Sequence, residues 1–258
     1  MIARLFETQR PLMIAGTVSF ALFAITAVLI FADATEILGI NRWIKPMKFF
    51  ISIAIFLWTI ALYFDLLPTG AGRLNKIAWM IIAIFVIEMA VIAGQPLRGE
   101  TSHFNTSSAF NGALFAAMGT AIATLTVIMF YVAYLYFRSE VQLPAAVVLG
   151  LRLGLVVMLL GSLQGAYMSS QMGHAVGVPD GGAGLPLVNW STEGGDLRAA
   201  HFIGLHGLQA IPLFAAIYQR YRPAAATLAT AAFAVVYAGA FTAVFIQAVY
   251  GQPLLAIF

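Results

Sequence analysis

The sequence predicts an all-α integral membrane protein, and three observations support this fold class. Hydrophobic residues make up 62% of the 258 positions and charged residues only 9%, which leaves too little polar surface to solvate a globule of this size. The apolar residues form continuous runs long enough to cross a bilayer as helices. The alternating pattern of a membrane β-barrel is absent from the sequence. We therefore expect helices, which satisfy the backbone hydrogen bonds inside lipid.

Seven segments are long and apolar enough to span a membrane. In chain order they cover residues 11–32, 46–67, 74–95, 110–137, 144–171, 199–219 and 224–250. Short connections join most of them. We expect residues 1–258 to form one membrane domain, a seven-helix bundle with no separate soluble domain.

The starts of the first two segments carry basic residues. Arg4 and Arg10 precede the first, as in a signal peptide, but its apolar run exceeds the roughly 7 to 15 residues of such peptides, so we expect a retained helix. The second follows the stretch NRWIKPMKFF. Here Lys45 and Lys48 are either interfacial anchors, together with Trp43, or cations that line an outer vestibule.

The third segment carries Glu88 and Gln95, which are seven residues apart and share one helix stripe. A carboxylate at this depth is costly in hydrocarbon unless it is paired or protonated, and Lys48, Arg98 or His206 are candidate partners. After Pro96 the chain reads LRGETSHFNTSSAFN before the fourth segment becomes apolar. We expect this polar run at the membrane interface or dipping inward.

The fifth segment contains two small-xxx-small pairs, Gly150 with Gly154 and Gly161 with Gly165. Such pairs bring helices together within one subunit or between subunits, so a homo-oligomer is one expectation. Arg152 lies about two turns into this segment, where it can reach the interface or pair with Asp65 or Glu140.

The connection 172–198 is long and rich in Gly and Pro, which is typical of either a mobile loop or a lid over the bundle mouth. Asp196 is a suitable N-cap for the sixth helix. In that helix Arg198, His201, His206 and Gln209 fall within one sector about 140° wide. His201 and His206 are themselves about 140° and 7.5 Å apart, so a straight helix cannot easily give both to one small metal ion.

The distribution of basic residues gives the orientation. Seven are expected on the N-terminal side and five on the other: Arg4, Arg10, Arg73, Lys76, Arg138, Arg220 and Arg222 against Arg42, Lys45, Lys48, Arg98 and Arg198. The positive-inside rule then places the N-terminus in the cytoplasm and the C-terminus outside. We expect a bacterial inner membrane and a periplasmic-facing site. The net charge of +3 is explained by cytoplasmic loops and gives no reason to expect nucleic acid as a partner.

All four histidines fall on or near the outer connections, and they are the candidate metal ligands: His103, His174, His201 and His206. Two further sets complete the candidate site. The candidate catalytic carboxylates are Glu88, Glu100 and Glu193. The candidate cofactor-binding residues are Arg98, Arg198, Gln164, Tyr167 and Gln209. The chain has no cysteine, which excludes thiolate ligands and iron–sulfur clusters.

Three functions fit these residues, and the sequence does not decide whether the protein is an enzyme. The first is redox or electron-transfer chemistry at a haem or divalent transition metal held by the histidines, with arginines neutralising propionates. The second is a zinc-dependent hydrolase with a carboxylate as general base. The third is an outward-open transporter or receptor for a small molecule, with histidines as pH-sensitive groups. Motifs of soluble enzymes, such as GxGxxG, HExxH and GxSxG, are absent from the sequence.

Overall fold

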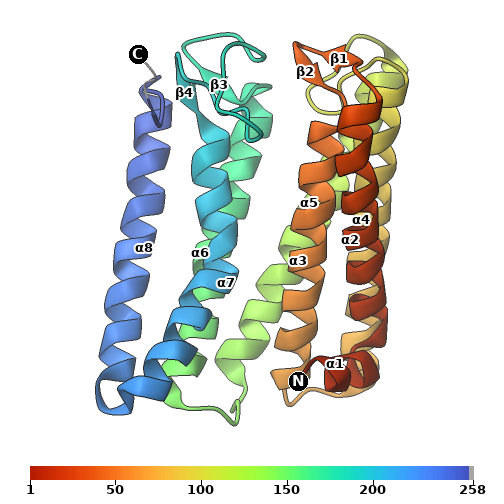
Figure 1. Ribbon diagram of the computed structural model, residues 1–258. Helices are drawn as coiled ribbons and strands as arrows, with labels where there is room; N and C mark the ends of the chain where they lie inside the picture. The colour runs from red at the N-terminus through yellow and green to blue at the C-terminus, as the bar shows by residue number, and fades with distance from the viewer. Residues whose placement is uncertain (256–258) are drawn as a thin grey trace. The chain divides into compact units, whose positions relative to one another are not determined.

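The computed structural model describes residues 1–255 and is built almost entirely of helices (Figure 1). Seven helices in this part of the chain are long and apolar enough to cross a membrane. This finding confirms the predicted all-α membrane fold with seven spans.

The long helices are α2 Arg10–Ala32, α3 Ile44–Leu66, α4 Ala71–Leu97, α5 Ala109–Arg138, α6 Ala145–Gln171, α7 Leu197–Tyr221 and α8 Ala226–Val249. The short elements are the helix α1 Ile2–Thr8, the 3-10 helix η1 Pro223–Ala225, and the strands β1 Glu36–Ile37, β2 Ile40–Asn41, β3 Ala175–Val176 and β4 Gly195–Asp196. Each predicted span corresponds to one long helix, with bounds shifted by at most three residues.

The chain forms two compact units, Met1–Ile128 and a second that begins at Met129. The first unit holds α1 to α4 and the longer part of α5, and the second holds the end of α5 with α6, α7 and α8. Each unit carries one two-stranded antiparallel sheet, β1–β2 in the first and β3–β4 in the second. The expectation of one continuous bundle stays a prediction.

In the first unit, α2 packs on α3 through a small residue. A Cβ atom at Gly16 would lie 2.6 Å from Nε1 of Trp58, so only glycine allows this approach. At the end where α1 lies, away from the β1–β2 hairpin (Figure 1), Asp65 of α3 accepts a 2.8 Å hydrogen bond from Thr8 and forms an ion pair with Arg4. These contacts tie α1 to the end of α3.

Asp33 fixes the connection between α2 and α3. Its carboxylate accepts hydrogen bonds from Thr35 Oγ1 at 2.7 Å, Trp43 Nε1 at 2.8 Å and Arg42 Nε at 2.6 Å. The side-chain hydrogen bonds from Thr35 and Trp43, with the other bonds to this carboxylate, hold the pKa of Asp33 well below its usual range. Trp43, predicted as an interfacial anchor, is therefore held by a carboxylate.

In the second unit, α6 and α7 meet at backbone contact. A Cβ atom at Gly161 would lie 2.7 Å from the carbonyl carbon of Gly204, and one at Gly150 would lie 2.7 Å from Cβ of Ala215. A Cβ atom at Gly165 would meet the ring of His201 at 2.6 Å. The small residues predicted to bring helices together therefore do so within this chain, between α6 and α7.

Helix α8 completes the second unit by packing on α7 and α6. Val157, Ile211 and Ala234 form a buried cluster that joins the three helices. The hydroxyl of Tyr237 donates a 2.8 Å hydrogen bond to the carbonyl of Ile203, and Phe233 stacks on Phe214 with ring centroids 4.2 Å apart.

Replacement of Gly161 by Ala tests the α6–α7 contact. The new methyl group would meet the backbone of Gly204, which cannot move away as a flexible side chain can, so we expect a loss of about 1 to 3 kcal/mol in stability. Gly239→Ala is the control, because in the described chain a Cβ atom there meets nothing within 4 Å. We expect the midpoint of thermal unfolding in detergent to fall for Gly161→Ala and to stay or rise for Gly239→Ala. Equal midpoints would contradict the contact.

Candidate functional site

The candidate residues of the first unit centre on Glu88, a buried carboxylate within the span α4. The residue is only 3% exposed, and its Oε1 atom has no hydrogen-bond partner among the described residues. Lys45, at the start of α3, lies close enough to act on Glu88 electrostatically. The sequence suggested Lys48, Arg98 or His206 as partners, and the structure adds Lys45. An intramembrane carboxylate with an unsatisfied oxygen is a functional candidate on physical grounds.

Two turns further along α4, Gln95 and Arg98 form a network with Asn111 of α5. Arg98 donates to Gln95 Oε1 at 2.6 Å, and Gln95 Nε2 donates to Asn111 Oδ1 at 3.0 Å. The Arg98 guanidinium also lies over the ring of Phe110, 4.7 Å from its centroid. Neutral amides and an aromatic ring hold this cation, so its positive charge remains uncompensated within the network.

The connection between α4 and α5 is held by its own polar side chains. Asn105 donates to Glu100 Oε2 at 2.8 Å, which fixes the carboxylate that the sequence marks as a candidate base. The ring of His103 lies 3.1 Å from Ser102 Oγ and 5.8 Å, between centroids, from Phe49 of α3. His103 therefore packs against the first turns of α3, in the same unit as Glu88.

The long connection between α6 and α7 is folded. Strands β3 and β4 pair at its two ends, and a second turn within it is closed by the hydrogen bonds Leu185 N to Trp190 O and Asn189 N to Leu185 O, both 2.8 Å. The sequence left open whether this connection is a mobile loop or a lid. In the structure it is a hydrogen-bonded loop at the β3–β4 end of α6 and α7 (Figure 1).

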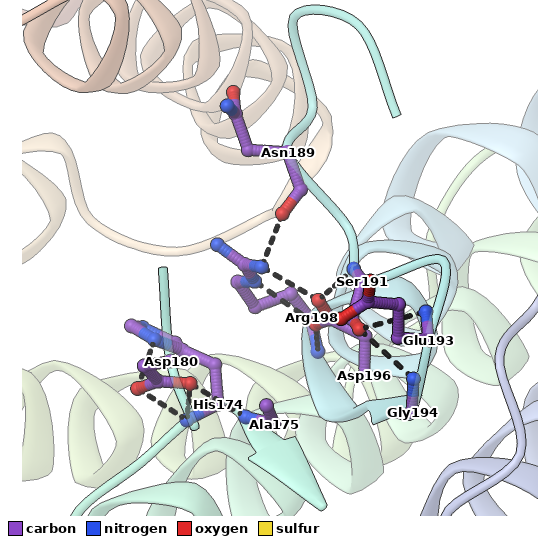
Figure 2. A network of polar contacts seen from close by, with 9 residues as sticks. All are labelled: His174, Ala175, Asp180, Asn189, Ser191, Glu193, Gly194, Asp196 and Arg198. Carbon is purple, nitrogen blue, oxygen red and sulfur yellow. Dashed lines mark hydrogen bonds and ion pairs between the residues drawn. The ribbon is translucent and has the colours of Figure 1, made fainter. Parts of the chain in front are cut away.

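His174 and Asp180 form the first of two polar clusters in this loop (Figure 2). The ring Nδ1 of His174 lies 3.1 Å from Asp180 Oδ2, and the backbone N–H of Ala175 donates to Asp180 Oδ1 at 2.8 Å. Burial would raise the pKa of Asp180, but hydrogen bonds from His174 and from the Ala175 N–H outweigh it and hold the pKa well below its usual range. His174 is therefore engaged in stabilising the loop.

Asp196 and Arg198 form the second cluster, where the loop enters α7 (Figure 2). Asp196 is 2% exposed and is the N-cap of α7, as predicted, because its side chain accepts from the backbone N–H of Arg198 at 3.0 Å. The Arg198 guanidinium donates to both carboxylate oxygens, at 2.9 and 2.6 Å, and to the carbonyl of Asn189. Arg198, predicted to bind an anionic cofactor group, is already paired with a carboxylate.

His201 lies between α6 and α7. Its Nδ1 atom is 2.9 Å from the carbonyl oxygen of Gly161, and its ring occupies the space beside Gly165. A carbonyl oxygen only accepts, so Nδ1 carries the hydrogen. Gly165 of α6 leaves room for the ring, so His201 can form an interhelical hydrogen bond that holds α6 and α7 together.

His206 lies one and a half turns further along α7 and is oriented differently. Its Nδ1 atom is 2.9 Å from the carbonyl oxygen of Phe202, one turn earlier in the same helix, and its ring stacks on Phe202 with centroids 4.0 Å apart. The same argument gives Nδ1 the hydrogen and leaves Nε2 with its lone pair. Trp190 of the loop contacts the ring of Phe202 edge-on, at 5.8 Å between centroids.

The remaining predicted residues of the second unit are dispersed. Gln164 is 5% exposed and donates to the carbonyl of Leu197 at 3.1 Å, where it joins α6 to the start of α7. Tyr167 packs edge-on against Phe245 of α8. Gln209 has a buried Oε1 atom with no hydrogen bond among the described residues, and Glu193 is exposed on the loop.

Within residues 1–255, no group of three or more His, Asp or Glu side chains is placed to hold a metal ion together. The prediction that His103 shares a ligand with His201 or His206 stays a prediction, since His103 belongs to the first unit and the other two belong to the second. The roles of Asn189 and Asp33 were not predicted from the sequence, because both depend on how their connections fold. Asp33 binds Arg42 and Trp43, and the Asn189 carbonyl accepts from Arg198.

Comparison with known proteins adds no relative. No family model, curated protein or solved structure matches the chain. The function is therefore argued from the geometry of the residues alone.

A double-mutant cycle tests the electrostatic interaction of Lys45 with Glu88. Lys45→Met removes the cation that acts on the buried carboxylate, so we expect it to destabilise the protein by about 1 kcal/mol more in the Glu88 background than in Glu88→Gln. The measurement is the thermal midpoint of the four proteins in one detergent. Additive effects of the two substitutions would show that the two side chains do not interact.

Asp196→Asn separates the charge of Asp196 from its capping role. Asn is as good an N-cap as Asp, so the expected loss of about 1 to 3 kcal/mol comes from removing the ion pair with Arg198 and the hydrogen bond that Asp196 Oδ2 accepts from the Ser191 N–H. Hydrogen exchange of the loop and of the first turn of α7 should accelerate in Asp196→Asn and recover in part when Arg198→Gln is added. Unchanged exchange in the single variant would mean that the ion pair contributes nothing to loop order.

Proposed function

We propose that the chain is an integral protein of a bacterial inner membrane that binds haem or another transition-metal cofactor and carries out redox or electron-transfer chemistry. The site faces outward, at the end of the second unit that carries β3 and β4. Its partner is a small-molecule ligand or a redox partner at the outer face.

The observation that carries the proposal is the orientation of His206. A histidine ligand generally donates its other ring N–H to a carbonyl or carboxylate, which fixes the tautomer and raises the basicity of the coordinating nitrogen. His206 has this arrangement, because Nδ1 donates to the carbonyl of Phe202 and Nε2 keeps its lone pair. The stacked ring of Phe202 restrains the imidazole further and gives it an aromatic, low-dielectric border.

His201 supports the ligand by a different route. It joins α7 to α6 five residues before His206, so the helix that presents His206 is fixed against its neighbour. Rigid support of this kind is what a ligand needs if it is to hold one geometry in both oxidation states of a metal. We therefore assign His206 as the metal ligand and His201 as a positioning residue.

Haem or a weakly chelated metal fits these residues better than zinc does. Zinc sites in proteins generally take three or four protein ligands, and the described residues offer no group of three. Haem iron needs only one or two axial ligands, because the porphyrin supplies the other four. The hydrolase interpretation, with Glu100, Glu193 or Asp196 as general base, has no comparable support.

The absorbance spectrum of the purified protein tests the proposal. Cells that express the protein with a haem precursor should yield a protein with a Soret band that shifts on reduction. His206→Ala should weaken haem binding at least tenfold, because it removes the nitrogen that would bind the metal. Free imidazole added to His206→Gly should restore the band in part.

His174→Ala is the matched control, since His174 is bound to Asp180 within the loop and its removal should leave the band unchanged. A wild-type protein with neither a Soret band nor a transition metal by elemental analysis would refute the proposal. A band that survives in His206→Ala and disappears in His174→Ala would move the ligand to the loop and equally contradict it.

A further inference from the structure

An open cleft lies at the opposite end of the second unit, away from β3 and β4. Its volume is about 490 Å³, and it is bordered by the α5–α6 connection, the first turns of α6 and the first turn of α8. Six of the residues that line it carry the argument: Ser139, Glu140, Leu143, Val148, Arg152 and Thr227. None of them takes part in the proposed metal site.

Arg152 is the cation of this cleft. Its guanidinium donates to the carbonyls of Tyr136 at 2.9 Å and Ser139 at 3.3 Å, and it lies 5.6 Å from the ring centroid of Phe137. The sequence suggested Asp65 or Glu140 as its partner. Within the part of the chain that the structure describes, however, no carboxylate forms an ion pair with it. The guanidinium is therefore held in place by carbonyls while its positive charge remains uncompensated.

The same end of the second unit is basic. Arg138 is the last residue of α5, Arg220 and Arg222 lie at the end of α7, and all three are exposed. Glu140 is the one acidic residue in the adjoining stretches 137–152 and 218–228. Arg152 lies about 10 Å along α6 from the first residue of the helix, deeper in the membrane than the three exposed arginines. This is the depth at which headgroups give way to acyl chains. The cleft thus combines a cation at its base with an apolar wall that includes Leu143 and Val148.

We propose that this cleft binds the phosphate-bearing headgroup of an anionic phospholipid. Guanidinium groups bind phosphate through directional, charge-assisted hydrogen bonds, and a group already oriented by two carbonyls loses little conformational entropy on binding. The hydroxyls of Ser139 and Thr227 supply further donors, and the apolar wall contacts the first methylenes of the acyl chains. A basic pocket between helices at the cytoplasmic surface is a recognised type of anionic-lipid site.

The experiment compares lipids that differ only in headgroup charge. Wild-type protein in detergent is titrated with phosphatidylglycerol, phosphatidylcholine or sodium phosphate, and the thermal midpoint gives the apparent affinity. We expect phosphatidylglycerol to stabilise the protein and the other two to have little effect. Arg152→Gln should weaken the phosphatidylglycerol effect about fivefold, because one cation near a membrane surface contributes roughly that factor.

Two further variants keep the test decisive if Arg152→Gln folds poorly. Glu140→Gln removes a negative charge from the cleft wall and should strengthen binding by up to about fivefold. Leu149 also lines the cleft, and Leu149→Trp should fill it without changing charge and abolish the effect. Arg10→Gln, at the start of α2 and outside the cleft, is the control and should bind as wild type.

Three outcomes would overturn the proposal. Equal stabilisation by phosphatidylglycerol and phosphatidylcholine would show that headgroup charge is not recognised. Stabilisation by sodium phosphate to the same extent as by phosphatidylglycerol would identify a site for a free anion. Equal losses in Arg152→Gln and Arg10→Gln would attribute the effect to overall charge. None of these measurements depends on a metal or on His206, so this proposal and the proposed function fail separately.

Discussion

The backbone contact between α6 and α7 at Gly161 and Gly204 is the constraint on which the second unit depends. Apolar side chains gain little from leaving lipid for a helix interface, so helices in a bilayer associate through close packing and interhelical hydrogen bonds. Only with the two backbones in contact can His201 reach the carbonyl of Gly161 and Gln164 reach the carbonyl of Leu197. A larger residue at Gly161 would therefore disturb the interhelical hydrogen bonds of both His201 and Gln164.

A second constraint is the cost of charge near hydrocarbon. Asp33, Asp180 and Asp196, in the connections outside the spans, each bind a basic partner, and backbone N–H groups also donate to all three carboxylates. Glu88 differs, because one of its oxygens is buried within the span and has no hydrogen bond in the described structure. Native proteins retain few such atoms, and those they retain are often functional.

The sequence predicted those features that depend on position along the helix axis. Span limits follow from bilayer thickness, Asp196 from the chemistry of helix starts, and the close approach at Gly161 from the spacing of small residues. Features that depend on the rotation of one helix against another were not predictable from one chain. Arg152 was expected to reach the interface or to pair with Asp65 or Glu140, and in the structure it donates to the carbonyls of Tyr136 and Ser139. Lys45 was not among the partners suggested for Glu88.

The different roles of the two α7 histidines follow from helix geometry. Five residues turn an α-helix through about 500°, so His206 emerges about 140° away from His201. His201 is directed at α6, where Gly165 leaves room for its ring, and the residue five positions later cannot share that surface. The Nδ1 atom of His206 therefore donates to a carbonyl of its own helix, that of Phe202. His201 therefore serves helix packing, whereas His206 keeps the lone pair of Nε2, the arrangement that a coordinating histidine needs.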